Sequence, residues 1–313
     1  MRKFLKICCI TGLCLLLAGG LCFVIGWGAT GFQLSALSNV KVEMFHYVET
    51  ENANIRTINI DYDVSDVEVV FGDQLKIDYP KRYKKNRKLL SDVTIKEDKE
   101  TGELTIKERS RFTISIVNFS DETLTLTLPQ DRMFTLNIKT DTGDVYLPSG
   151  GKYESLKIET DTGDISVQKS DCALGLDVEV ETGDVKISEF TGKYITVETD
   201  TGDVSVNHCT VLEKISLETD TGAIKTSGTV KTTDFFIEVS TGDVRLKDVL
   251  DADTVFIKTN TGDVSAVLKG KQSHYKISVD TNTGDCNIGN TSEGDRRLTI
   301  DTNTGDVKIQ FVE

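Results

Sequence analysis

Histidine, tryptophan and proline are scarce in this sequence: its 313 residues include three His, one Trp and three Pro. A catalytic site built on histidine therefore has few candidates, and His46, His208 and His274 lie in unrelated sequence contexts. The sequence also has no His-Glu-x-x-His pair, no Gly-x-Ser-x-Gly elbow and no phosphate-binding glycine loop. These features favour a non-catalytic protein.

Positive charge is in deficit. The chain has 36 Lys and Arg against 50 Asp and Glu, which leaves a formal net charge of −14. Nucleic-acid phosphates would be repelled by such a chain, so we expect no nucleic-acid partner.

The cysteine pattern does not form a disulfide framework. Four of the seven cysteines lie in the apolar N-terminal stretch, which leaves only Cys172, Cys209 and Cys286 beyond it. Three is an odd number, and none of the three forms a Cys-x-x-Cys pair, so no zinc site is expected either. Each lies beside or within an alternating pattern and is predicted to be a small apolar core residue.

An uncharged stretch, Ile7–Trp27, follows Arg2, Lys3 and Lys6. At ~1.5 Å per residue, a helix of this length covers about 30 Å, the thickness of a bilayer core. The sequence therefore predicts a cytoplasmic segment 1–6, a single transmembrane helix or uncleaved signal at 7–27, and an exterior remainder by the positive-inside rule. Signal-peptidase cleavage near residues 26–29 is the alternative.

One phrase, Thr-Gly-Asp, recurs with little variation from residue 136 to the end. Its nine glycines are separated by 19 to 22 residues and are Gly143, Gly163, Gly183, Gly202, Gly222, Gly242, Gly262, Gly284 and Gly305. Apolar residues occupy every second position on both sides of each glycine, as a half-buried strand requires. A period of about 20 residues is too short for a strand plus a helix with two connections. The fold class predicted is all-β, a parallel β-solenoid of about 20-residue coils.

The solenoid is expected to begin before the clear repeats. Residues 136–313 form the nine-repeat part, and residues 54–135 resemble degenerate coils, with Ser65-Asp66 in place of Gly-Asp. Residues 28–53 are assigned as a linker. Within 54–135, a run of cations after Pro80 indicates an exposed basic loop at 81–88.

The repeat produces three stacked rows of polar side chains. The first consists of the aspartates that follow the repeat glycines: Asp144, Asp164, Asp184, Asp203, Asp243, Asp263, Asp285 and Asp306. The second includes Asp141, Asp161, Glu181, Asp200 and Asp220, and the third includes Glu159, Glu179, Glu198, Glu218 and Glu238. Like charges stacked ~4.8 Å apart attract cations, so the first row is a candidate calcium ladder. The simpler interpretation, which we prefer, is that these aspartates accept hydrogen bonds from turn N–H groups. Ala223 replaces the aspartate in one unit. No other cofactor is predicted.

The basic loop is the candidate site for an anionic envelope polymer or lipid head group. Its cations are Lys81, Arg82, Lys84, Lys85, Arg87 and Lys88.

The anchor, the Leu128-Pro129 pair and the repeated Thr-Gly-Asp-Val resemble the bacterial DUF4097 family of adhesin-like proteins. The resemblance covers roughly residues 50–313. It implies a β-solenoid surface protein of the cell envelope, and some relatives are linked to envelope-stress signalling. It supplies no catalytic residue.

The sequence thus predicts a non-catalytic, single-pass membrane protein with its N-terminus in the cytoplasm and its solenoid outside the cell, acting as an adhesin or a ligand-binding module. A carbohydrate-active enzyme acting on envelope glycans and a purely structural spacer are the alternatives. Expected partners are the cell membrane and an envelope polymer or surface protein. The final coil, ending at Glu313, would expose a parallel edge through which copies could self-associate.

Overall fold

The computed structural model describes residues 40–50, 54–84, 88–110 and 123–313. The predicted cytoplasmic segment 1–6 and transmembrane segment 7–27 lie outside these ranges. Within them, no helix is both long enough and apolar enough to cross a bilayer.

The chain divides into two compact units by contacts. Among the described residues, the first contains 40–43, 81–84, 88–92 and 110, and the second contains 44–50, 54–80, 93–109 and 123–313.

The second unit is a parallel β-solenoid, which confirms the predicted fold. Alternation in the sequence explains its strands: Leu156 and Ile158 are fully buried, whereas the intervening Lys157 is exposed. Equivalent apolar residues stack from coil to coil, and each fully buried Leu, Ile or Val contributes about 1.5–3 kcal/mol. One such buried column consists of Leu136, Leu156, Leu176, Ile195, Ile215, Phe235, Val255, Leu298 and Ile277.

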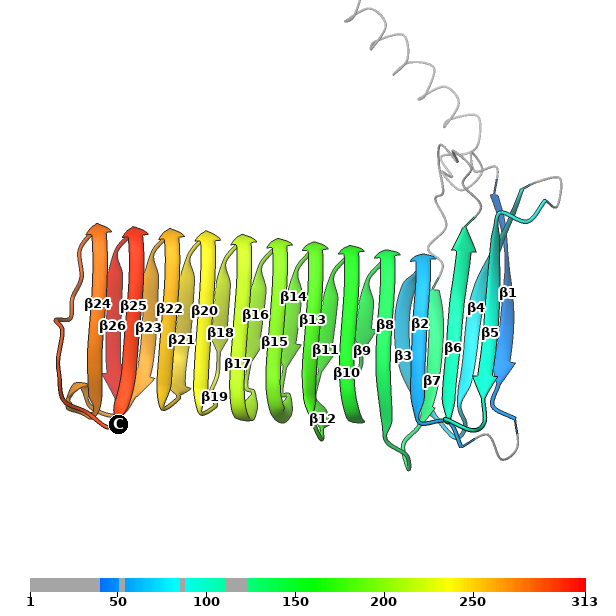
Figure 1. Ribbon diagram of the computed structural model, residues 1–313, viewed down its shortest axis with the longest axis horizontal. Coiled ribbons are helices and arrows are strands. Elements are labelled where there is room, and N and C mark those ends of the chain that lie inside the picture. The colour runs from blue at the N-terminus through cyan, green and yellow to red at the C-terminus, as the bar shows by residue number, and fades with distance from the viewer. Residues whose placement is uncertain (1–39, 51–53, 85–87, 111–122) are drawn as a thin grey trace, which may run out of the picture. The chain divides into compact units, whose positions relative to one another are not determined.

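Each coil places one long strand on the same side of the solenoid, and we call the outer surface of these strands the long-strand face (Figure 1). In spatial order the strands are β6 (Glu103–Ser110), β2 (Thr57–Val64), β8 (Phe134–Thr142), β10 (Gly151–Thr162), β13 (Gly175–Thr182), β15 (Thr191–Thr201), β17 (Thr210–Thr221), β20 (Asp234–Thr241), β22 (Thr254–Thr261), β25 (Arg296–Thr304) and β24 (Tyr275–Thr283).

After the glycine corner the chain enters a second strand, and these strands form the short-strand face. In spatial order they are β7 (Thr123–Pro129), β3 (Asp66–Gly72), β9 (Val145–Leu147), β11 (Ile165–Gln168), β14 (Val185–Ser188), β16 (Val204–Asn207), β18 (Ile224–Ser227), β21 (Val244–Asp251), β23 (Val264–Lys269) and β26 (Val307–Val312).

A third side closes several coils with short pairings. There β12 (Ser170–Cys172) pairs with β10 and β15, and β19 (Val230–Lys231) pairs with β17 and β21. The remaining elements are β1 (Val40–Val48), β4 (Lys76–Lys84), β5 (Ser91–Asp98) and the 3₁₀ helix η2 (Gln272–His274).

The coils are not stacked in sequence order at either end of the solenoid. The last long strand, β25, lies between β22 and β24 (Figure 1), and the first, β2, lies between β6 and β8. The prediction that the C-terminal coil forms the exposed edge is therefore wrong for the long-strand face, where β24 is the outermost strand. On the short-strand face, β26 of the C-terminal coil is the last strand of the stack. The unit containing β24 suits the outer position, since after its corner it makes only a single bridge, from Cys286 to Val307, in place of a full short strand.

In the first unit, the predicted basic loop is in part a short antiparallel hairpin. Tyr83 and Leu89 form an antiparallel bridge, and the Leu90 N–H donates to the Arg82 carbonyl at 2.9 Å. Lys81, Arg82 and Lys84 therefore continue β4, and Arg82 is only 7% exposed. Pro80 lies two residues beyond Asp78, where the antiparallel pairing of β4 with β7 ends, so it removes no hydrogen bond from that pairing. Lys85 and Arg87 lie outside the described residues.

Candidate functional site

The repeated Thr-Gly-Asp corner joins the two faces. At Gly163 the backbone has φ +153°, and a Cβ there would lie 2.1 Å from the Gly143 carbonyl oxygen of the preceding coil. Only glycine avoids both the strain and this collision. The glycine carbonyls also receive hydroxyls from the buried strand ends, as when Thr219 donates to the Gly202 oxygen at 3.2 Å.

The corner aspartates form a hydrogen-bond ladder between coils, interrupted only at Ala223 among the described corners. The Asp184 N–H donates to Asp164 Oδ1 at 2.8 Å, and the Asp164 N–H donates to Asp144 Oδ1 at 2.7 Å. The ladder begins at Asp66, in the degenerate part of the solenoid. Asp66 Oδ1 accepts a hydrogen bond from the Asp144 N–H. The prediction that these aspartates accept N–H groups is confirmed, although the N–H belongs to the next coil in the stack and not to the same turn. The other acceptors are Asp184, Asp203, Asp243, Asp263 and Asp306.

This ladder leaves one oxygen of each corner aspartate outside the coil-to-coil bonding. Within the described ranges, no three or more His, Cys, Asp or Glu side chains are grouped so that they could hold a metal ion. The calcium ladder stays a prediction.

The long-strand face carries an acidic row. The register aligns Glu159, Glu179, Glu198, Glu218 and Glu238 across consecutive strands. Lysines bracket this row: Lys139 pairs with Glu159 at 3.1 Å, and Lys258 pairs with Glu238. A second row of carboxylates runs beside it and gives way at one end to an asparagine ladder, in which Asn282 donates to Asn303 and Asn303 to Asn260.

Crowding of carboxylates shifts their proton affinity. Burial, followed by the charges of Glu198, Glu238 and Asp220, raises the pKa of the Glu218 carboxyl above its ordinary value. Burial and the neighbouring Asp63 and Asp161 likewise raise the pKa of Asp141. The face is therefore a region of negative potential that attracts cations.

The short-strand face is different, because its outer row contains cations and hydroxyls. Ser166, Lys186, Ser205, Lys225, Arg245, Ser265 and Lys308 are aligned across successive strands. A depression of about 400 Å³ opens over β16, β18 and β21 in this row. The solenoid thus carries opposite charge on the two sides of one corner.

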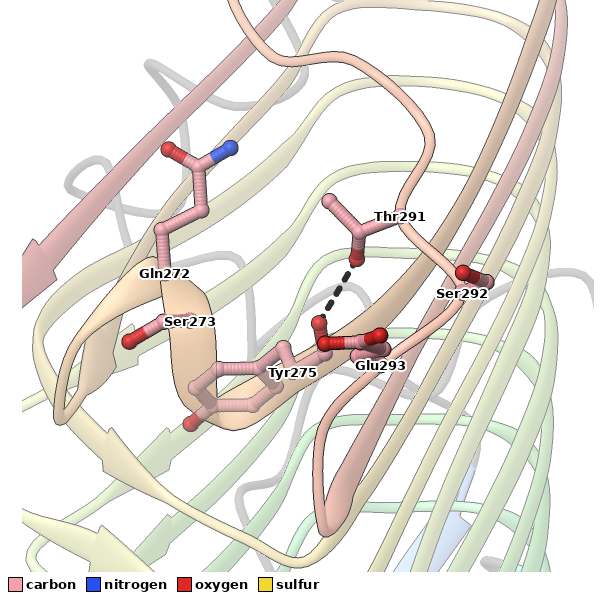
Figure 2. A pocket seen from close by; sticks show the side chains of 6 residues that line it. All are labelled: Gln272, Ser273, Tyr275, Thr291, Ser292 and Glu293. Atoms are coloured by element: carbon pink, nitrogen blue, oxygen red, sulfur yellow. Dashed lines mark hydrogen bonds between the residues drawn. The ribbon is translucent and has the colours of Figure 1, made fainter.

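A second depression, of about 520 Å³, lies at the C-terminal end of the stack. Figure 2 shows Gln272 and Ser273 on one wall and Thr291 and Ser292 on the other. The Thr291 hydroxyl donates to the Tyr275 carbonyl at 2.7 Å, which fixes the two walls to each other. Its lining is polar and mixed in character, and Glu293 is its only charged member.

The three histidines come from separate parts of the fold. His46 lies in β1, His208 follows β16, and His274 ends η2. Cys172 and Cys209 are buried, as predicted, and burial raises the pKa of the Cys209 thiol to about 11, which disfavours a nucleophilic thiolate. Cys286 is partly buried.

Sequence reasoning missed the depression on the short-strand face. Two signals pointed to it: Ala223, the one unit without a corner aspartate, and Arg245-Leu246-Lys247, which places two cations on one face of a strand in the next unit. Only the coil-to-coil register shows that these departures from the repeat are neighbours.

A family model described as Toastrack DUF4097 matches residues 55–310. The chain belongs to this family, as the Leu128-Pro129 pair and the repeated Thr-Gly-Asp-Val suggested. No curated protein shows significant similarity to it.

Two solved structures are similar to the chain. One is a candidate adhesin from Bacteroides fragilis, with 15% identity, a TM-score of 0.46, and coverage of 87% of this chain and 97% of the other. The second is a candidate cell adhesion protein from Clostridium sporogenes, with 12% identity, a TM-score of 0.27, and coverage of 87% and 100%.

Proposed function

We propose that the chain is a non-catalytic, membrane-anchored surface module whose solenoid binds a repeating component of the cell envelope. The observation that carries the proposal is the regular array of charged side chains on two adjacent faces, acidic along β10–β20 and basic along β14–β21. Parallel strands repeat every ~4.8 Å, so an extended polymer can contact equivalent groups on successive coils.

The location rests on the sequence. The uncharged stretch Ile7–Trp27, with cations only on its N-terminal side, supports a single-pass anchor with the solenoid outside the cell. Surface proteolysis of intact cells tests this location: cleavage within the solenoid supports it, and protection of the solenoid in intact but not in lysed cells contradicts it.

Binding is tested with the full-length chain in detergent micelles, sedimented with purified cell-wall sacculi that retain or lack their anionic polymers. We expect co-sedimentation that weakens as salt is raised, because both faces act through exposed charges. Soluble sugar released from the sacculi is measured in the same samples, and we expect none. Release of sugar would show an enzyme acting on envelope glycans. Absence of both binding and release would show a spacer.

A further inference from the structure

The depression on the short-strand face is lined by side chains that donate hydrogen bonds. Six of them are outer residues of three consecutive coils: Ser205, Asn207, Lys225, Ser227, Arg245 and Lys247. Ser205, Lys225 and Arg245 are aligned in one row by the strand register. Asn207 and Ser227 are aligned beside it, and Lys247 follows Arg245 by two residues on the same strand. No carboxylate lines the depression.

Two of the three cations are held in place by corner aspartates. Lys225 pairs with Asp203, and Arg245 pairs with Asp243. Lys247 is exposed and has neither a hydrogen bond nor an ion pair in the part of the chain that the structure describes. The lining itself thus carries three cations and no carboxylate, and the third nearby carboxylate, Asp248, accepts the Gly228 N–H outside the lining.

Ala223 changes the ion pairing at this corner. In two of the three other units with a cation two residues after the corner aspartate, the two residues pair on their own strand: Asp243 with Arg245 and Asp306 with Lys308. Ala223 removes this carboxylate, so Lys225 reaches back to Asp203 of the preceding coil.

The replacement also interrupts the corner ladder. The N–H of Ala223 still donates to Asp203 Oδ1, but Ala223 offers no side-chain oxygen to the following coil. Among the described residues, no acceptor is found for the Asp243 N–H. The Ala223 corner thus lacks a hydrogen bond that the other inner corners have, and it lies beside a cluster of cations. Such a local loss of stability is typical of a functional position.

The donors present match a phosphate group. Arg245 offers a planar fork of N–H groups, and Lys225 and Lys247 offer point charges. Ser227 donates to Asn207 Oδ1 at 2.5 Å, which leaves the Asn207 amide N–H groups directed away from that bond. We propose that this depression is a phosphate-binding site, and that it recognises a phosphate-bearing polymer of the envelope. The inference deepens the proposed function and rests on it for the source of the phosphate.

The test uses the full-length chain in detergent micelles with two probes, inorganic phosphate and long-chain polyphosphate, titrated by calorimetry. Lys247→Gln removes a cation that makes no contact of its own. Ala223→Asp restores the carboxylate of the repeat and supplies an acceptor for the Asp243 N–H. Lys186→Gln is the matched control, because Lys186 is exposed in the same row of the same face but outside the depression.

We expect Lys247→Gln and Ala223→Asp each to weaken polyphosphate binding roughly fivefold to tenfold, the effect of one charge at a solvated site, and Lys186→Gln to change it less than about twofold. Thermal melts show that each variant is folded, and Ala223→Asp melts no lower than the parent chain. Equal weakening by Lys186→Gln would overturn the site in favour of general attraction to the face. Unchanged binding by both site variants would also overturn it.

The two probes separate the sources. If the affinity per phosphate group is much higher for polyphosphate than for inorganic phosphate, the result supports a polymer as the ligand. Equal affinities per group would show a site for small ions and would overturn the proposal of a polymeric ligand. Sacculus binding that survives Lys247→Gln and Ala223→Asp would leave the proposed function intact while removing this site from it. Phosphate binding without any sacculus binding would contradict the proposed function alone.

Discussion

At the scale of the residue, each corner depends on two side chains with separate tasks. Glycine permits the coils to approach, because any Cβ at Gly163 would collide with the Gly143 carbonyl. The aspartate accepts a main-chain hydrogen bond: Asp164 Oδ1 accepts the N–H of Asp184, the corner aspartate of the next coil. The negative charge is not required for that bond, since an amide oxygen accepts a hydrogen bond equally well.

Asp164→Ala and Asp164→Asn separate the acceptor from the charge. We expect the alanine variant to lose about 1 kcal/mol of unfolding free energy, because the Asp184 N–H loses its hydrogen-bond acceptor. The asparagine variant retains the acceptor, and we expect it to unfold within about 0.5 kcal/mol of the parent. Denaturant unfolding followed by circular dichroism measures both. Equal destabilisation by the two substitutions would show that the charge itself matters.

The same pair tests the calcium prediction from the sequence. Calcium takes 6–8 oxygen ligands, and the ladder already engages Oδ1 of each acceptor aspartate, so we expect no rise in melting temperature specific to calcium over magnesium. A rise confined to calcium in the parent chain, and absent in Asp164→Asn, would establish the aspartates as ligands.

At the scale of the element, neighbouring strands impose their side-chain rows on one another. Because the register is constant, Glu198, Glu218 and Glu238 of β15, β17 and β20 are placed directly side by side. Each carboxylate is repelled by the next, and burial adds to the cost of the charge. The apolar column beneath these strands stabilises them, and this packing offsets the repulsion between the carboxylates of the acidic row.

Glu218→Gln removes the central charge of this row. The raised pKa of Glu218 means that the native state binds its proton at higher pH than the unfolded chain does. Stability therefore falls as pH rises above the ordinary glutamate value of 4.5, and the substitution relieves this loss. We expect Glu218→Gln to stabilise the protein by a few tenths of a kcal/mol at about pH 7 and low salt, with the gain vanishing at about pH 4.

Glu238→Gln is the matched control, since Glu238 lies in the same row but pairs with Lys258. We expect a smaller gain or none, because the substitution gives up an ion pair while it relieves repulsion. Melting curves across pH compare the two variants. A gain from Glu218→Gln that persists unchanged in acid would contradict an electrostatic origin.

The elements were predictable where the repeat is regular and unpredictable where it is not. Strict alternation around each glycine, as at Leu156 and Ile158, determines which side chains face the core. The spatial order of coils is not encoded in spacing, because β24 and β25 carry similar patterns and either could pair with β22. The cations of the depression could not be grouped from the sequence either, since Lys225 and Lys247 become neighbours only through stacking.

At the scale of the whole second unit, the coils at both ends of the stack are out of sequence order, and the C-terminal edge is covered. The N–H of Val279 in β24 donates to Asn290 Oδ1 at 2.6 Å, and the N–H of Ile277 donates to Thr291 Oγ1 at 3.0 Å. The segment after β24 thus satisfies donors that an edge strand would otherwise offer to another chain. Self-association stays a prediction, and on the long-strand face the edge available to it is β24.

The double variant Asn290→Ala, Thr291→Val removes both side-chain acceptors and preserves the volume at Thr291. We expect it to self-associate at concentrations where the parent chain is monomeric in micelles. The Val279 N–H at the edge of β24 is then unpaired, and the Ile277 N–H keeps only its bond to the Thr291 carbonyl. Sedimentation over a range of protein concentrations measures this, and Ser292→Ala, a neighbour that also lines the depression of Figure 2, is the control. If the parent chain and the double variant associate equally, the contact between copies lies elsewhere on the molecule. Monomers throughout would show that the remaining main-chain bonds between Ile277 and Thr291 are enough to cover the edge.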